Sequence, residues 1–158
     1  MTKLTKGGTK HKLSGCFSRD GMGPLVRIDG IMDATKYKGI LQRQMLPHAR
    51  EYMAPNWIFQ HDNDPKHTSG LVKRYLERQQ VRVLPWPAQS PDLNPIEHVW
   101  GELEKRVRTK NYRNGDELFA ALQREWDRFD IETCIKLVDS MGNRCAAVKA
   151  SKGFPTKY

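Results

Sequence analysis

The middle of the chain alternates between short apolar runs and a stretch with helical periodicity, and this order limits the folds open to it. Residues 57–59 read Trp-Ile-Phe and residues 81–84 read Val-Arg-Val-Leu, both typical of short buried strands. The helical stretch between them, residues 68–79, has its apolar residues on one side: Leu71, Val72, Tyr75 and Leu76. Strand, helix and strand in this order favour a parallel pair, because the helix carries the chain back to its starting end. The chain is therefore predicted to have an α/β fold, with a mixed sheet flanked by helices.

The flanking segments add further elements to this layer. Residues 13–18 and 24–28 are predicted to be a strand pair, joined by a turn at residues 20–23. The helical pattern of residues 33–53 begins at Asp33 and is interrupted at Pro47. Four prolines between residues 85 and 95 force an extended connection, after which helices are expected over residues 95–109, 116–129 and 131–148. At 158 residues the chain can bury one core, so residues 1–158 are expected to form a single domain.

The charge of the chain favours a polyanionic partner. There are 27 Lys and Arg residues against 18 Asp and Glu, and the net charge is +9. Nucleic acid is the leading candidate, although many proteins are basic only for solubility. No apolar run reaches the roughly 18 residues of a membrane span, and no secretory signal is visible. The three cysteines are too widely spaced for a disulfide framework or a zinc site, which fits an intracellular, reducing location.

Two carboxylates one residue apart follow the first of the two apolar runs. Asp62-Asn63-Asp64 imitates the start of a calcium-binding EF-hand loop, but His67 stands where glycine is needed and Lys73 where a glutamate belongs. The alternative is an Asx-turn that leads into a helix capped by Thr68. Asp62 would also lie at the carboxyl end of a strand, where open α/β sheets bind their ligands. The residues alone leave the turn and the ligand-binding site open.

A third carboxylate, Glu97, begins the helix after the prolines. Asn94 as N-cap, Pro95 at the first helical position and Glu97 at the third would form a capping box, which needs no chemistry. The helix is expected to bury one stripe: Ile96, Val99, Trp100, Leu103 and Val107. Glu97 lies about 100° round the helix from Ile96, at the edge of that stripe, from where its carboxylate can point toward the strand ends.

Four stretches together resemble the catalytic domain of the Tc/mariner superfamily of DDE transposases. They read GCFSRDGMGPLVRIDGIMDA, WIFQHDNDPKHTSGLVKRYL, WPAQSPDLNPIEHVWGELEKRV and the closing KGFPTKY. The 34 residues between Asp62 and Glu97 match the spacing of the second and third catalytic carboxylates of that family. The resemblance implies an RNase H-like fold. It also implies an enzyme that cleaves double-stranded DNA at transposon ends and joins the cleaved end to a target. It also implies a nuclear location, with a cytoplasmic one as the alternative.

The same resemblance implies that Asp62 and Glu97 are catalytic metal ligands in a two-metal site for Mg²⁺ or Mn²⁺. Two carboxylates about 4 Å apart repel each other by about 4 kcal/mol at an effective dielectric constant near 20, and a divalent cation reverses this. Paired cations stabilise both the attacking and the leaving oxygen of a phosphodiester. The residues expected to contact DNA are Lys66, His67, Lys105, Arg106 and Arg108, although a solvated loop is the simpler interpretation of Lys66 and His67.

The chain departs from the family pattern at its start. The family has a first catalytic Asp roughly ninety residues before the second, on the opening strand, and only 61 residues precede Asp62 here. Asp20 belongs to the Gly-rich turn and is not a substitute. Residues 10–14, apolar in the family, are largely polar and are expected to pair weakly. The first strand is therefore expected to be missing, leaving an unprotected sheet edge that favours oligomers.

Two functions compete under this interpretation. The chain is either a piece of an active transposase, with metal binding and DNA cleavage impaired in isolation, or a catalytically inert DNA-binding remnant or recruited module. An RNase H-like nuclease of another kind is disfavoured, because the carboxylate spacing and the PDLNPIE stretch are particular to this group of transposases.

Overall fold

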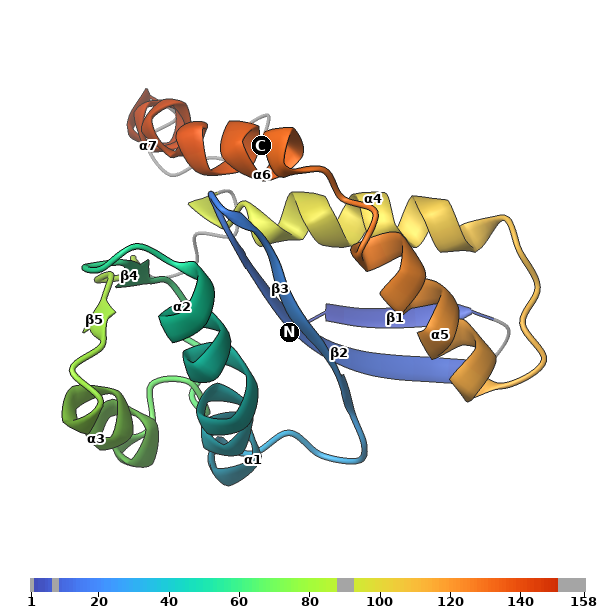
Figure 1. The fold of residues 1–158 in the computed structure, drawn as a ribbon, viewed down its shortest axis with the longest axis horizontal. Helices are drawn as coiled ribbons and strands as arrows, with labels where there is room; N and C mark the ends of the chain where they lie inside the picture. The colour runs from blue at the N-terminus through green and yellow to red at the C-terminus, as the bar shows by residue number, and fades with distance from the viewer. Residues whose placement is uncertain (1, 7–8, 88–92, 151–158) are drawn as a thin grey trace.

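The computed structural model describes residues 2–6, 9–87 and 93–150 of the chain. Three strands form an antiparallel sheet in the order β1-β2-β3: β1 (Thr2–Lys6), β2 (Thr9–Ser18) and β3 (Gly21–Ile28). The long β2–β3 hairpin runs through the centre of the molecule, as Figure 1 shows. The predicted strand pair is confirmed, but its turn is tighter than expected. It lies at Arg19 and Asp20, where the Asp20 amide donates to Ser18 Oγ at 3.0 Å.

The predicted strand–helix–strand unit is also present. Its strands β4 (Ile58–Phe59) and β5 (Arg82–Val83) pair in parallel, with α3 (Gly70–Arg78) between them in the sequence. Both strands are shorter than the apolar runs suggested. Among the described residues, these two strands form a sheet of their own, which is not hydrogen-bonded to the β1-β2-β3 sheet.

A continuous helical run joins the two sheets. It consists of α1 (Ala34–Ile40), a π-helical turn η1 (Leu41–Met45) and α2 (Leu46–Tyr52). Asp33 caps its start as expected, with the side chain accepting from the Lys36 amide at 2.7 Å. The expected interruption at Pro47 is wrong, because the helical run continues through Pro47 into α2. The wide turn η1 precedes it directly and absorbs the irregularity.

The second half of the chain is helical: α4 (Ile96–Arg108), α5 (Gly115–Trp126), α6 (Ile131–Asp139) and α7 (Met141–Ala150). The last two replace the single helix expected over residues 131–148. The capping box predicted for α4 does not form, since Pro95 occupies the N-cap position without a side-chain cap bond. Helix α5 does have a side-chain cap: Asn114 accepts from the Glu117 amide at 2.9 Å, and the Glu117 carboxylate accepts from the amide of Arg113, just before the cap, at 2.6 Å.

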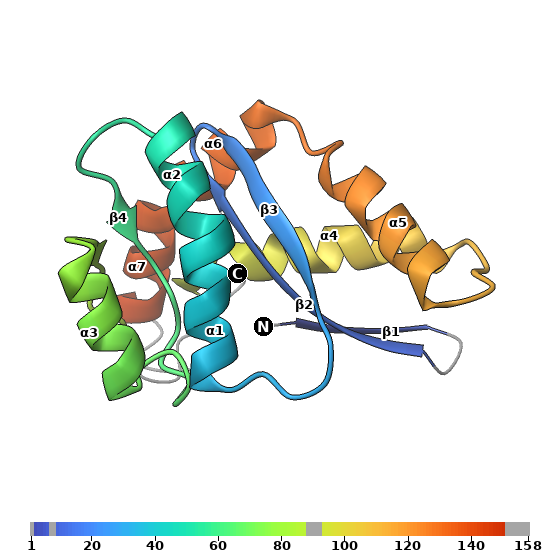
Figure 2. The same ribbon diagram turned by 60° about the horizontal axis from the view of Figure 1, so that its bottom comes forward.

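The β2–β3 hairpin carries a separate apolar core on each of its two faces. Helices α4, α5 and α6 pack on one face around Leu13 and Leu25, and α1 to α3 pack on the other around Ile28 (Figures 1 and 2). The first core is built on Trp126, whose indole N–H donates to the Gly23 carbonyl at 2.8 Å. Gly15 permits this packing, because a Cβ there would lie only 2.6 Å from the Trp126 ring.

The remaining expectations concern the buried face of α4, the start of β2 and residues outside the described ranges. The stripe predicted for α4 is buried as expected, with Ile96 at its margin. In the polar stretch of residues 10–14, residues 10–13 pair with β1 and residues 12–14 pair with β3. The closing stretch from residue 151 and residues 88–92 of the proline-rich connection lie outside the described residues. None of the described helices is long and apolar enough to cross a membrane.

Candidate functional site

The loop after β4 is a pair of interlocked turns built by two aspartates. Asp62 Oδ1 accepts from the Asp64 amide at 3.1 Å, and Asp64 Oδ1 accepts from the Lys66 amide at 3.1 Å. The Asp64 carbonyl then accepts from the His67 amide at 2.8 Å. The predicted Asx-turn is therefore confirmed, whereas the cap of α3 is Ser69 and not Thr68. The turns reverse the chain and bring the His67 side chain back to Asp62.

His67 fixes the Asp62 carboxylate. The His67 Nδ1 and Asp62 Oδ1 atoms lie 2.5 Å apart, and His67 is only 5% exposed. The expectation of a solvated loop is therefore wrong for His67. The hydrogen bond from His67 holds the pKa of the Asp62 carboxyl far below its usual range, although partial burial acts in the opposite direction. Asp62 is consequently an anion at any pH near neutral, with one oxygen bound and the other without a hydrogen-bond partner among the described residues.

Tyr37 on α1 supports this pair from the side. Its ring centroid lies 4.0 Å from that of His67, and its hydroxyl lies 3.1 Å from His61 Nδ1. Burial lowers the pKa of His61 to about 4, so its ring is neutral near pH 7 and Nδ1 can accept from the hydroxyl. Burial also raises the pKa of Tyr37, which keeps the hydroxyl protonated. Sequence reasoning missed Tyr37, because its place in the helical pattern marked it only as a core residue.

The basic residues expected to contact DNA lie in two places, the loop after β4 and the end of α4. The Lys66 ammonium is paired with the Asp64 carboxylate, and the Lys66 side chain is only 14% exposed. Lys105 and Arg108 are exposed near the end of α4. Arg106 lies 3.3 Å from Glu102 and over the Phe129 ring at 4.2 Å. Since His67 is buried against Asp62, it does not face solvent, whereas the end of α4 does.

Glu97 lies in the first turn of α4 and is exposed. Its amide donates to the Asn94 carbonyl at 3.1 Å, but its side chain makes no hydrogen bond or ion pair with any described residue. A cavity of about 400 Å³ is lined by Asp62 together with Asn94, Pro95 and Ile96. The structure thus brings the start of α4 and Asp62 to one cavity, although Glu97 does not line it.

The described residues offer an incomplete ligand set for a metal ion. Carboxylate oxygens are the ligands that Mg²⁺ prefers, and Asp62 has an oxygen available for that role. Nowhere within residues 2–6, 9–87 and 93–150 do three or more His, Cys, Asp or Glu side chains cluster so that they could hold a metal ion. The three cysteines are free, and only Cys134 is fully buried. The donor chemistry fits a divalent cation, and the number of donors falls short of a full site.

Residues 2–119 match the protein family described as DDE superfamily endonuclease. The chain belongs to this family. It is 48% identical over 152 residues to the Tcb1 transposase of Caenorhabditis briggsae, covering 96% of this chain and 56% of that protein. It is 45% identical over 152 residues to the Tc1 transposase of Caenorhabditis elegans, with the same coverage of 96% and 56%. The chain spans about half the length of these curated relatives.

The DDE family assignment agrees with the solved structures that this chain resembles. The Mos1 transposase paired-end complex with left transposon end has a TM-score of 0.87 at 22% identity, covering 99% of this chain and 48% of that one. The Mos1 transposase catalytic domain with Raltegravir and Mg has a TM-score of 0.82 at 21% identity, covering 99% and 82%. Identities this low establish the fold alone. The predicted RNase H-like fold is confirmed, as is the resemblance to Tc/mariner transposases.

Proposed function

We propose that this chain supplies Asp62 and Glu97 as two metal-binding carboxylates of a DDE catalytic centre that cleaves transposon DNA and transfers its strands. One observation carries the proposal: Asp62 and the first turn of α4 border the same cavity in a chain of this family. Their 34-residue separation in sequence supports it further. Asp62 is the better prepared of the two, because His67 orients its carboxylate and keeps it ionised.

The described side chains have distinct roles in this proposal. Asp62 presents one free oxygen, and the turn at Asp64 together with His67 holds the carboxylate through its other oxygen. Glu97 supplies the second carboxylate from the start of α4. Mg²⁺ or Mn²⁺ ions bound there, as a pair in the complete site, would supply the positive charge that stabilises the attacking and leaving oxygens of a phosphodiester. Solved Mos1 catalytic domains that contain Mg and Mn support this choice of cation.

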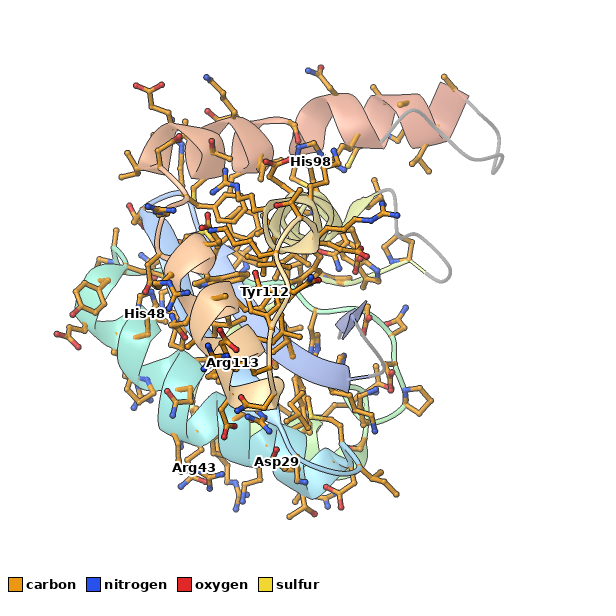
Figure 3. The ribbon with its side chains drawn as sticks, turned by 90° about the vertical axis from the view of Figure 1, so that its right-hand side faces the viewer. Asp29, Arg43, His48, His98, Tyr112 and Arg113 are labelled. Atoms are coloured by element: carbon orange, nitrogen blue, oxygen red, sulfur yellow. The ribbon has the colours of Figure 1, made fainter. Side chains whose placement is uncertain are left out.

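We further propose that the chain contacts double-stranded DNA through the basic end of α4, at Lys105, Arg106 and Arg108. Figure 3 shows Arg113 on the connection that follows α4, which extends this basic end. The net charge of +9 supports the proposal, and binding should weaken steeply with salt because each phosphate contact releases counterions. A nuclear location and assembly as a homo-oligomer belong to the same proposal.

The 158-residue chain by itself should cut DNA negligibly, because two carboxylates are fewer than the three a DDE centre needs. Purified chain mixed with supercoiled DNA and Mn²⁺ is expected to leave the DNA intact. Metal-dependent nicking that disappears in Glu97→Gln would contradict this expectation.

A chimera tests the proposed roles of Asp62 and Glu97 directly. In it, this chain replaces the matching 56% of the Tcb1 transposase, to which it is 48% identical. Asp62→Asn and Glu97→Gln should each abolish cleavage of transposon ends. The matched controls are Asp127→Asn, at the exposed residue that follows α5, and Glu104→Gln, at an exposed position on α4. Both should keep the cleavage activity. Cleavage that survives Glu97→Gln would refute the assignment.

A further inference from the structure

The ion pairs of this chain lie outside helices α1 to α3. At the β2–β3 turn, Arg19 pairs with Asp139 of α6 at 3.1 Å, and after α5 Arg128 pairs with Glu125 at 2.9 Å. On the described elements α1, η1, α2, α3 and β5, in contrast, no lysine or arginine takes part in an ion pair. Positive charge on this part of the chain is therefore not compensated by the fold.

Six of these unpaired cations are exposed, and we call them together the arginine face: Arg43, Arg50, Lys73, Arg74, Arg78 and Arg82. The same five elements contain only two carboxylates, Glu51 and Glu77. A surface with this surplus of positive charge repels itself, and a polyanion that binds there removes the repulsion.

Two contacts join the helices that carry the arginine face. The Arg50 guanidinium donates to Gln79 Oε1, just after α3, at 2.7 Å. The Lys38 ammonium of α1 lies 5.4 Å from the centroid of the Tyr75 ring of α3. Arg43 precedes Arg50 by seven residues, or about two helical turns, so both project from roughly the same side of the helical run. Figures 1 and 2 show α1 and α3 packed side by side.

Neutral groups hold the arginine side chains in place. Arg78 Nε donates to the Arg74 carbonyl at 3.3 Å. The Arg43 guanidinium lies against Gly39, where a Cβ would come within 2.9 Å of it, and Arg74 lies in the same way against Gly70, at 3.0 Å. These partners fix the guanidinium groups without neutralising them. Because each guanidinium has five N–H donors, most of its donors remain available to a ligand.

We propose that the arginine face is a second surface for double-stranded DNA, which binds the phosphates of a duplex without reading its bases. It lies away from the basic end of α4, since Figure 3 shows Arg43 and His98 of α4 on opposite sides of the molecule. A chain with both surfaces occupied would hold two duplex segments at once. The inference adds to the proposed DNA contact of α4, and it does not depend on catalysis by Asp62 and Glu97.

A duplex fits this surface better than an acidic polypeptide does. The helical run over residues 34–52 is about 28 Å long, and a duplex of that length carries about 16 phosphates, one per 1.7 Å. Even a polypeptide made only of Asp and Glu presents one charge per 3.4 Å or so. Five of the six cations are arginines, whose planar guanidinium groups bind phosphate through two parallel hydrogen bonds. The chain also belongs to a family of endonucleases.

The first test maps the binding surface by NMR. It uses the ¹⁵N-labelled 158-residue chain with Lys105→Gln and Arg108→Gln, so that the basic end of α4 contributes little, and a random-sequence duplex of about 16 base pairs. We expect the amide signals of α1, α2 and α3 and the arginine Nε–H signals of the arginine face to shift, while the signals of α5 stay unchanged. Loss of DNA binding at α4 alone would leave these shifts in place, so the two DNA surfaces are tested separately.

The second test compares two triple variants of equal net charge in the same background. One variant removes three cations of the arginine face: Arg43→Gln, Arg74→Gln and Arg78→Gln. The matched control removes three exposed cations that lie in ion pairs: Arg19→Gln, Arg128→Gln and Lys136→Gln. At about 50 mM salt, we expect the first variant to bind the duplex at least about tenfold more weakly and the control to stay within about twofold. The slope of log affinity against log salt should fall by about 2–3 in the first variant only, because each phosphate contact contributes about 0.9.

Three results would overturn the inference. The first is the absence of shifts on α1, α2 and α3 at duplex concentrations on the order of 100 μM, where non-specific DNA binding is measurable. The second is equal weakening in the two triple variants, because net charge alone would then explain the binding. The third is that polyglutamate, or vesicles that contain anionic lipid, shift the same signals at least as strongly as DNA at equal charge concentration. An acidic polypeptide or a membrane surface would then be the better partner.

Discussion

Asp62 and Glu97 carry the same chemical group, but the chain prepares the two carboxylates to very different degrees. Asp62 accepts hydrogen bonds from His67 and from the Asp64 amide, and its side chain is 40% exposed. Glu97 is exposed and makes no side-chain hydrogen bond or ion pair with the described residues. One half of the proposed site is therefore fixed by the packing of this chain alone. The orientation of Glu97, the other half of the site, depends on the ligand that binds there.

The difference has a structural origin. Asp62 lies in a loop that is pinned by two Asx-turns and by the contact of His67 with Tyr37, a residue of α1. Glu97 lies in a first helical turn whose N-cap is Pro95, which offers no side-chain partner. Orienting a free glutamate costs side-chain entropy, of the order of 1–2 kcal/mol. A cation held by both residues would have to offset this cost at Glu97 but hardly at Asp62.

The largest expected effect concerns the two histidines next to these carboxylates. His67→Ala removes a buried ring, its stacking on Tyr37 and the donor to Asp62, and should lower the free energy of unfolding by about 2–4 kcal/mol. His98→Ala is the matched control, since His98 is exposed on α4 beside Glu97 (Figure 3) and its loss should change stability by less than about 0.5 kcal/mol. Urea unfolding measures both. Equal stability of the two variants would contradict the expected difference between the surroundings of Asp62 and Glu97.

A smaller effect is expected when the carboxylates themselves are neutralised. Asp62→Asn loses a charge-assisted hydrogen bond from His67, which should cost about 1–2 kcal/mol after solvent screening at this half-exposed position. Glu97→Gln loses no partner among the described residues and should be neutral within about 0.5 kcal/mol. Thermal unfolding in metal-free buffer measures the difference. A Glu97→Gln variant as destabilised as Asp62→Asn would show that Glu97 is also held by the fold.

The smallest expected effect concerns Tyr37. Tyr37→Phe keeps the ring against His67 and removes only the hydroxyl that lies 3.1 Å from His61 Nδ1. The variant should lose roughly 0.5–1 kcal/mol of stability, the contribution of one hydrogen bond. The imidazole NMR signals of His61 should shift, while those of His67 should stay nearly unchanged. Shifts confined to His67 would mean that Tyr37 acts through a different contact.

Several parts of this fold could be predicted because they depend on neighbours in the sequence. The β2–β3 hairpin, the β4–α3–β5 unit and the buried stripe of α4 follow from periodicity in the apolar residues. The turn at Asp62 and Asp64 follows from local hydrogen bonding by aspartate side chains. In each case, a window of about twenty residues contains the physical cause.

The prediction for His67 was wrong for a reason that lies outside such a window. His67 is buried because Tyr37, thirty positions earlier, packs against its ring, and no local pattern records that contact. The capping box expected at Asn94 fails because the helix begins one residue later, with Pro95 as its cap. Asn114 does cap α5, because its side chain accepts from the Glu117 amide.

The most direct test asks whether Asp62 and Glu97 share one divalent cation. Mn²⁺ is paramagnetic and broadens NMR signals of nearby nuclei, so it can be titrated into the ¹⁵N-labelled chain at concentrations on the order of 1 mM, suited to a weak carboxylate site. The account predicts that the amide signals of residues 62 and 97 broaden together, with one midpoint, and that Asp62→Asn or Glu97→Gln alone abolishes broadening at both. Broadening at only one of the two positions, or two independent midpoints, would contradict it.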